Sequence, residues 1–318
     1  MPSEPSDSNF KSKVTLKSYP TAVRGGLVWA YMGPKDKMPG LPDYEWLRAP
    51  DTHRFCTKVF ERCNYLQGLE GGLDSSHTSF LHRRGMGDKR YLSNRDGAPK
   101  LEVDITPFGF SYSSIRHFDT EQNYVRLYHF MLPAQQVRPG VLSLTGESNI
   151  PAFHGHIWVP IDDENSCVYN WAFGYDHSVP LGNEYQAGYE AKDGRGPEEY
   201  VPGTFFLRQN MANDYLIDRQ VQKTSSYTGI PGVNTQDFAM QEGMGAIPDR
   251  SGEHLGRSDR AIIAARRMLS DAVAAVERGE TPPGVEPETY RNARPHDAVV
   301  PKATDWRQAF AQELIAKF

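Results

Sequence analysis

The segment that decides the fold runs from residue 64 to residue 82 and reads NYLQGLEGGLDSSHTSFLH. Leu66, Leu69 and Leu73 recur at helical spacing, so the sequence predicts a helix over this segment. Three glycines between residues 68 and 72 weaken that helix by about 1 kcal/mol each relative to alanine. We therefore expect these glycines to serve close packing or a kink.

The same segment carries two histidines and a carboxylate, at Asp74, His77 and His82. Two neutral imidazoles and one carboxylate are the ligand set of non-haem Fe(II) oxygenases, which leaves coordination positions open for oxygen. On a regular helix His77 and His82 would point about 140° apart, so a shared metal requires a kink or a helix end. By spacing alone, two hydrogen-bonded histidines without a metal remain the commoner interpretation.

A second candidate segment lies far along the chain, at residues 235–245, TQDFAMQEGMG. It is typical of a helix start, with Thr235 as the cap and Asp237 in the first turn. Asp237 is then either a carboxylate that favours the helix dipole or a third metal ligand from a remote part of the chain. Spacing does not decide between these two roles.

The other histidines give weaker signals. His154 and His156 share one face of an expected strand and could chelate a metal, but a hydrogen-bonded pair that lines a pocket or a surface is the favoured interpretation. His117, His129 and His177 are isolated, and we expect no metal role for them.

Outside these motifs the pattern indicates an α+β fold, an antiparallel sheet packed against a few helices. Runs rich in β-branched and aromatic residues predict strands at 23–32, 54–61, 109–118, 124–132, 154–160 and 167–175. Helical spacing predicts helices at 213–223, at 258–278 with Ser258 as cap, and from 305 to the C-terminus with Thr304 as cap. Residues 177–203 are polar and are expected to form a long excursion.

Composition excludes several classes of protein. Lys and Arg total 35 against 40 Asp and Glu, a net charge of −5, which does not favour nucleic-acid binding. The three cysteines form no C-x-x-C motif, which excludes a disulfide framework and a cysteine-held cluster and suits the cytoplasm. No apolar run approaches the roughly 20 residues of a membrane span.

The run from Arg62 to His82, with its D-x2-H-x4-H motif, resembles the iron-binding segment of Rieske-type non-haem iron oxygenases. It is most similar to the phthalate dioxygenase oxygenase group, and residues 218–259, with Q-D-x3-Q-E, resemble the same group. The resemblance implies a helix-grip-like catalytic domain with a central antiparallel sheet and flanking helices. It also implies O2-dependent hydroxylation or O-demethylation of an aromatic substrate.

The resemblance implies roles for individual residues. His77, His82 and Asp237 match the ligands of the mononuclear Fe(II). Asp74 matches an aspartate that hydrogen-bonds a ligand histidine and connects it to the Rieske cluster of a neighbouring subunit. Asn64 matches an upstream asparagine to which we assign no role.

The chain departs from the family in one respect, because it lacks the C-x-H and C-x-x-H ligands of a Rieske [2Fe-2S] cluster. We expect this cluster in a longer form of the protein or in a partner. Residues 1–34 resemble the end of a Rieske domain, so Met1 is expected to be an internal methionine. The expected organisation is 1–34 as this remnant, 35–50 as a linker and 51–318 as the catalytic domain.

Partners follow from the same resemblance. We expect an NADH-dependent reductase, a homotrimer or a multiple of it, and an aromatic substrate that is an aryl carboxylate. Arg116 and Arg126 are candidates for binding that carboxylate, although solvated strand faces are the favoured interpretation. The rival function is a truncated, inactive helix-grip module that binds an aromatic ligand without turnover. A zinc hydrolase is disfavoured because no glutamate adjacent to His77 and His82 is placed as a general base.

Overall fold

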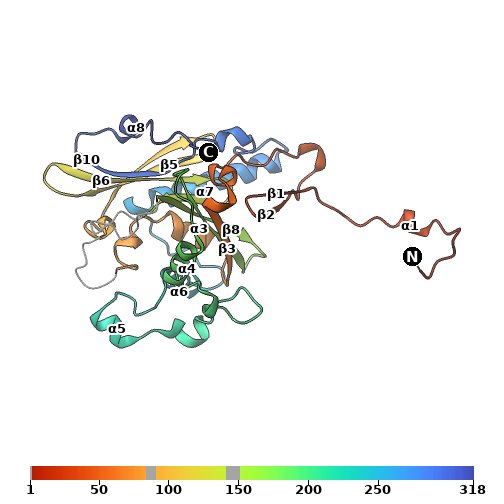
Figure 1. Ribbon diagram of the computed structural model, residues 1–318, viewed down its shortest axis with the longest axis horizontal. Coiled ribbons are helices and arrows are strands. Elements are labelled where there is room, and N and C mark those ends of the chain that lie inside the picture. The colour runs from red at the N-terminus through yellow and green to blue at the C-terminus, as the bar shows by residue number, and fades with distance from the viewer. Residues whose placement is uncertain (1, 84–90, 141–150) are drawn as a thin grey trace.

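The protein is described here by a computed structural model, which covers residues 2–83, 91–140 and 151–318. Within these ranges the centre is an eight-stranded antiparallel sheet (Figure 1). Its strands follow the order β3-β9-β8-β7-β6-β5-β4, and β10 pairs with β6. The strands are β3 Arg54–Glu61, β4 Lys100–Thr106, β5 Gly109–His117, β6 Gln122–Met131, β7 Gln135–Pro139, β8 Ala152–Pro160, β9 Ser166–Gly174 and β10 His296–Pro301.

Helices cover both faces of this sheet. The helices are α3 Tyr65–Leu73, α4 Asn183–Lys192, α5 Arg219–Thr224, α6 Val233–Gly243, α7 Arg260–Glu277 and α8 Trp306–Ala309, with α1 Phe10–Lys13 and α2 Glu45–Arg48 before them. In Figure 1, α3, α4 and α6 lie below the sheet, whereas α8 lies above it beside β10. This arrangement confirms the expected mixed α+β fold.

Alternation along the strands divides the buried side chains between the two faces of the sheet. Val59, Tyr112, Phe130 and Trp158 point to the face that α3, α6 and α7 cover, which we call the inner face. Trp46 of α2, Trp171 and Phe173 belong to the core on the outer face. The candidate metal ligands all come from segments on the inner side.

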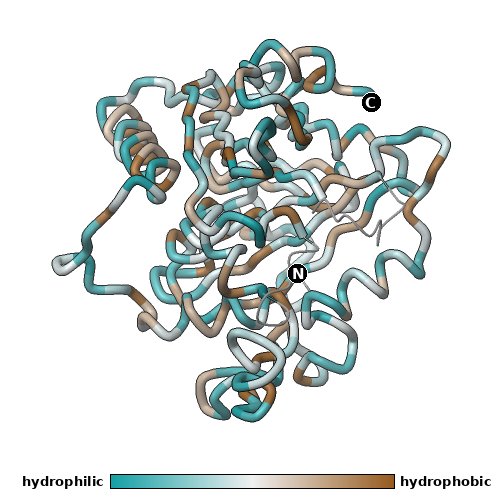
Figure 2. The backbone as a smooth tube through the Cα atoms, turned by 90° about the vertical axis from the view of Figure 1, so that its left-hand side faces the viewer, coloured by the Kyte–Doolittle hydropathy of each residue, from teal (hydrophilic) through white to brown (hydrophobic). Residues whose placement is uncertain are grey.

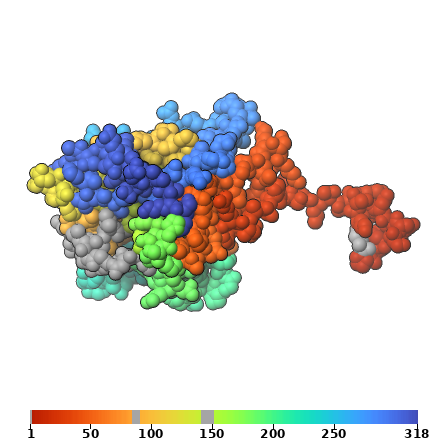
Figure 3. Space-filling view, turned by 45° about the horizontal axis from the view of Figure 1, so that its top comes forward, coloured from red at the N-terminus to blue at the C-terminus, as the bar shows by residue number. Residues whose placement is uncertain are grey.

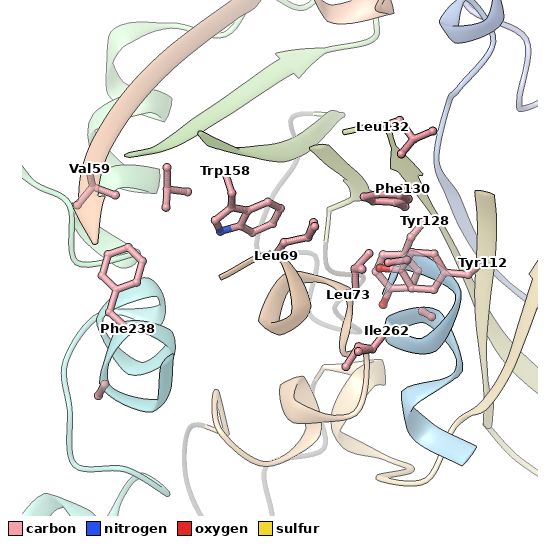
Figure 4. Close-up of a cluster of buried hydrophobic side chains, with 14 of the residues drawn as sticks. Val59, Leu69, Leu73, Tyr112, Tyr128, Phe130, Leu132, Trp158, Phe238 and Ile262 are labelled. Carbon is pink, nitrogen blue, oxygen red and sulfur yellow. The ribbon is translucent and has the colours of Figure 1, made fainter. Parts of the chain in front are cut away.

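Helix α3 lies directly against the inner face, and glycine makes this approach possible. A Cβ atom at Gly72 would lie 2.3 Å from the Trp158 ring, and one at Gly68 would lie 2.6 Å from it. Figure 4 shows Leu69 and Leu73 of this helix among the side chains of the inner core. The expected helix over 64–82 is shorter than predicted, because it ends at Leu73.

Several other boundaries differ from the sequence expectation. Residues 177–203 contain α4, and the helix expected from 305 to the C-terminus is limited to α8. The helix caps also differ: Gly232, Asp259 and Asp305 stand at the N-terminal ends of α6, α7 and α8. Thr235, Ser258 and Thr304 were therefore wrong as caps.

The N-terminal part of the chain leaves the body of the molecule. Residues 2–18 project away from it (Figures 1 and 3). A separate hairpin follows, in which β1 Thr21–Arg24 pairs only with β2 Leu27–Ala30 among the described strands. Its Trp29 packs against the outer core, so the hairpin is attached to the body of the protein. Residues 35–50, expected as a linker, include α2, in which Trp46 and Leu47 are buried.

No helix in the described part of the chain is long and apolar enough to cross a membrane. Figure 2 agrees with this finding, since hydrophobic and hydrophilic segments alternate along the backbone.

Candidate metal centre

The three residues expected as metal ligands lie together. His77 Nε2 and His82 Nε2 are 3.1 Å apart, and Asp237 Oδ1 lies 3.7 Å from the first and 3.2 Å from the second. One ligand atom of each residue lies within 4.8 Å of the others, although Asp237 is 155 positions beyond His82. The fold thus brings the two candidate segments into one cluster.

The end of α3 explains how two histidines five positions apart can face one point. Asp74 stands at the C-terminal end of α3 with an extended backbone, and its carboxylate accepts a hydrogen bond from the Ser76 amide at 2.7 Å. A short 3₁₀ turn, His77–Ser79, follows. The chain between His77 and His82 therefore does not have the α-helical geometry that would separate the two rings.

Hydrogen bonds fix the orientation of both imidazole rings. His77 Nδ1 lies 2.5 Å from the backbone carbonyl of Asp74, and His82 Nδ1 lies 2.9 Å from Oε1 of Gln236. Both partners are oxygen acceptors, so each Nδ1 carries a proton. The Nε2 atoms that face each other are therefore the ones available to a cation.

The electrostatics of the cluster favour a shared positive charge. Burial lowers the pKa of His77, and the nearby His82 lowers it further. Burial alone would also lower the pKa of His82, but Asp237 outweighs burial and raises it above its ordinary value. Burial alone would raise the pKa of Asp237, but His82 and His77 outweigh burial, so this pKa is lowered. The cluster thus favours protonation of His82 and ionisation of Asp237, so it attracts positive charge.

The size of the cluster fits one divalent ion. Three ligands about 2.1 Å from a common ion lie roughly 3.0 to 3.4 Å apart at octahedral or tetrahedral angles. Two of the observed separations, 3.1 and 3.2 Å, lie in this range, and the third, 3.7 Å between His77 and Asp237, is slightly longer. The side chains of His77, His82 and Asp237 are 22%, 15% and 18% exposed, so solvent reaches the cluster.

Asp74 lies beside His77 but contacts it differently from the expectation. Its carboxylate is 3.8 Å from His77 Nδ1, beyond hydrogen-bond distance, and the backbone carbonyl makes the hydrogen bond instead. The Asp74 side chain is 28% exposed. Its carboxylate thus stays accessible at the surface of the cluster.

Arg116 supports the turn that follows α3. It is fully buried and donates to the carbonyl of Ser75 at 2.5 Å, and Tyr128 shares a hydrogen bond with the Ser75 hydroxyl at 3.0 Å. The favoured interpretation of Arg116 and Arg126 as solvated strand residues was wrong, because both are buried on the inner face. Arg126 donates to the carbonyl of Pro139 at 2.7 Å.

His154 and His156 also lie on the inner face, where they form hydrogen bonds with Tyr185 and Asn170 at 2.9 and 2.7 Å. Burial lowers the pKa of both, and Arg138 adds to the effect. His156 lowers the pKa of Asp237 and so belongs to the surroundings of the metal cluster. The described structure brings no carboxylate into hydrogen-bond contact with either histidine, so neither completes a second metal site.

The remaining candidates have structural roles. Asn64 caps α3 by accepting a hydrogen bond from the Leu66 amide at 3.0 Å. His129 is buried and bonds the carbonyl of Arg294, whereas His117 and His177 are exposed. Sequence reasoning missed the roles of Gln236 and Arg138. The Q-D pair at residues 236–237 was the signal for Gln236, and no motif pointed to Arg138.

Comparisons with known proteins identify the family to which the chain belongs. The family described as "LigXa C-terminal domain like" matches residues 30–317. The phthalate 4,5-dioxygenase oxygenase subunit of Pseudomonas putida is 34% identical over 99% of this chain and 73% of its own length. The 3-chlorobenzoate-3,4-dioxygenase oxygenase subunit of Comamonas testosteroni is 31% identical over 99% of this chain and 75% of its length. A crystal structure of dicamba monooxygenase bound to dicamba has a similar fold, with a TM-score of 0.51 and 10% identity over 82% of this chain and 71% of its own.

The sheet, the helices around it and these relatives define the catalytic domain of a Rieske-type oxygenase. The chain belongs to the LigXa C-terminal-like family of these enzymes. It is thus an oxidoreductase that acts as an oxygenase component, and it spans about three quarters of the length of the two relatives.

Proposed function

We propose that this chain is the catalytic part of an aromatic ring-hydroxylating oxygenase with mononuclear Fe(II) held by His77, His82 and Asp237. The observation that carries the proposal is the pair of Nε2 atoms 3.1 Å apart with Asp237 beside them. Two imidazoles and one carboxylate bind Fe(II) and leave positions open. When bound, the iron would supply the activation of O2.

The chain's own residues orient this site. Asp237 contributes the negative charge that a divalent ion requires, and the Asp74 carbonyl keeps the proton of His77 on Nδ1. Arg116 holds the adjoining turn through the Ser75 carbonyl. The ligands are therefore held in place before a metal or a substrate arrives.

The cations of the inner face support an aryl carboxylate as substrate. Arg138 of β7 donates to the Tyr189 hydroxyl at 3.1 Å. Its charge lowers the pKa of His156, and His156 in turn lowers the pKa of Asp237, so Arg138 lies in the surroundings of the metal cluster. None of the ion pairs among the described residues includes Arg138, and the nearby carboxylates of Glu190 and Asp193 pair with Arg195 instead. A substrate carboxylate would supply this charge through a charge-assisted hydrogen bond. The two relatives are named for phthalate and 3-chlorobenzoate, which are aromatic carboxylates.

Electrons would come from a Rieske [2Fe-2S] cluster that this chain does not ligate, fed by an NADH-dependent reductase. The partly exposed carboxylate of Asp74 would form the contact toward that cluster in a homotrimer or a multiple of it. We also propose that residues 1–34 belong to a Rieske domain and that the protein acts in the cytoplasm. The first point is supported by the β1–β2 hairpin, which does not join the eight-stranded sheet.

The test combines the Fe(II)-loaded chain with a Rieske-containing partner, its reductase and NADH. We expect oxygen uptake and a hydroxylated or O-demethylated product from a benzoate-type substrate. Arg138→Gln should raise KM for the carboxylate about tenfold and leave turnover of a neutral arene unchanged. Binding of the aromatic compound without product under these conditions would favour the rival, a binding module without turnover.

A further inference from the structure

Gln236 connects the two halves of the metal cluster. It directly precedes Asp237 on α6, and its side chain makes two hydrogen bonds in opposite directions. Its Oε1 accepts from His82 Nδ1 at 2.9 Å, and its Nε2 donates to the carbonyl of Ile230 at 2.9 Å. One amide therefore joins the loop before α6, the helix itself and a histidine 154 positions earlier in the chain.

The donors and acceptors at Gln236 leave only one consistent arrangement. A backbone carbonyl such as that of Ile230 can only accept, so the amide must present its NH₂ group to it. The amide oxygen must then face His82, and His82 must donate from Nδ1. This leaves His82 Nε2, the atom 3.2 Å from Asp237, as the atom for a cation.

His77 is held in the same tautomer, with the proton on Nδ1, by a different acceptor. Its Nδ1 is held by the backbone carbonyl of Asp74, which a side-chain substitution cannot remove. The corresponding acceptor for His82 belongs to a side chain and can be removed. Gln236 is therefore the position at which the orientation of one candidate ligand can be changed while all three candidate ligands are kept.

We infer that Gln236 is a positioning residue that holds His82 in the metal-binding tautomer. The inference rests on the proposed metal site and adds to it a residue that does not touch the metal. Partners that orient metal-bound histidines typically contribute 10- to 100-fold to metal affinity. Loss of the Gln236 amide is expected to weaken Fe(II) binding by about this factor.

The test uses the purified metal-free chain and Fe(II) in an anaerobic competition with a chelator. Gln236→Met removes the amide and keeps a long side chain with good helix propensity, and it should weaken Fe(II) binding about 10- to 100-fold. Gln220→Met on α5 removes an exposed amide that makes no hydrogen bond to His77, His82 or Asp237, and it should leave the affinity unchanged. Gln236→Glu keeps an oxygen acceptor for His82 and should bind Fe(II) about tenfold more tightly than Gln236→Met.

A second measurement reports the tautomer without any metal. Long-range ¹H–¹⁵N NMR spectra of the metal-free chain, recorded at a pH at which His82 is neutral and with His82 assigned by comparison with His82→Gln, should show the proton on Nδ1. In Gln236→Met the spectra should instead show a mixture of the Nδ1–H and Nε2–H tautomers of His82.

Unchanged affinity and an unchanged tautomer in Gln236→Met would overturn the inference and leave the metal site standing. Equal weakness of Gln236→Glu and Gln236→Met would also overturn it. A wild-type chain that binds no Fe(II) would refute the metal site, and the inference with it.

Discussion

His77 Nε2 and His82 Nε2 lie 3.1 Å apart, and the other nitrogen of each ring is hydrogen-bonded to an oxygen acceptor. Two nitrogen lone pairs so placed repel each other unless a cation lies between them. In the metal-free chain a proton on His82 can supply that charge, because Asp237 raises the pKa of His82. A divalent metal would take the place of this proton, which makes metal binding dependent on pH.

The first prediction is that metal binding releases a proton from His82. Its pKa is raised, so below that pKa the metal displaces one proton, and above it the release falls toward zero. Because the folded chain binds this proton more tightly than the unfolded chain does, the His82–Asp237 pair stabilises the metal-free fold below pH ~6.5. This contribution is lost as the pH rises through the raised pKa of His82. Calorimetric titration with Fe(II) in buffers of different ionisation enthalpy measures the protons released at each pH. Release that does not change with pH would contradict the assignment.

The second prediction separates the Asp74 carboxylate from the metal cluster. Asp74→Asn keeps the backbone carbonyl that holds His77, and its amide oxygen can still accept from the Ser76 amide. Iron content should therefore equal that of the wild-type chain, whereas turnover with a Rieske-containing partner should fall about tenfold or more. Iron analysis and oxygen uptake on the same preparation check both halves. Wild-type turnover would refute the role of Asp74 toward the cluster.

The third prediction concerns the close approach of α3 to the sheet. Gly72→Ala should raise helix propensity yet destabilise the protein by about 1–3 kcal/mol, because the new Cβ would lie 2.3 Å from the Trp158 ring. The matched control is Gly188→Ala in α4, where a Cβ would meet nothing within 4 Å. That variant should stabilise by about 0.5–1 kcal/mol. Urea unfolding of both variants measures the difference, and equal effects would show that α3 does not depend on this contact.

The fourth prediction concerns stability in acid. Burial lowers the pKa of His129 to about 4, although the Arg294 carbonyl opposes the shift. Between pH ~6.5 and ~4 the unfolded chain binds a proton that the folded chain does not, so this histidine makes the fold less stable as pH falls, by about 1.4 kcal/mol per pH unit. His129→Gln should lose that part of the slope. Unfolding free energies at pH 4.5, 5.5 and 6.5 provide the check, and parallel slopes would contradict it.

The sequence predicted the fold class and the family because the signals were local. The D-x2-H-x4-H motif and the alternating strands can be recognised without knowing what packs against them. The convergence of Asp237 with His77 and His82 could not follow from spacing, since it depends on how α6 packs against α3. It came from the resemblance to the family.

The misinterpreted residues have a common physical origin. Arg116 and Arg126 were taken as solvent-facing because charged residues on strands usually face water. The inner face of this sheet is instead buried, and beside its apolar core it also holds polar residues such as Arg116, which donates to the carbonyl of Ser75. Gln236 was missed because its function depends on the carbonyl of Ile230, a partner that no side-chain pattern reveals.

The central claim is that His77, His82 and Asp237 form one iron site, and metal analysis of the purified chain tests it most directly. After anaerobic loading with Fe(II) and removal of excess metal, the wild-type chain should hold one iron, as should the control Gln220→Met. His82→Ala and Asp237→Ala should each hold almost none while remaining folded by circular dichroism. A folded His82→Ala chain that keeps a full equivalent of iron would contradict the account.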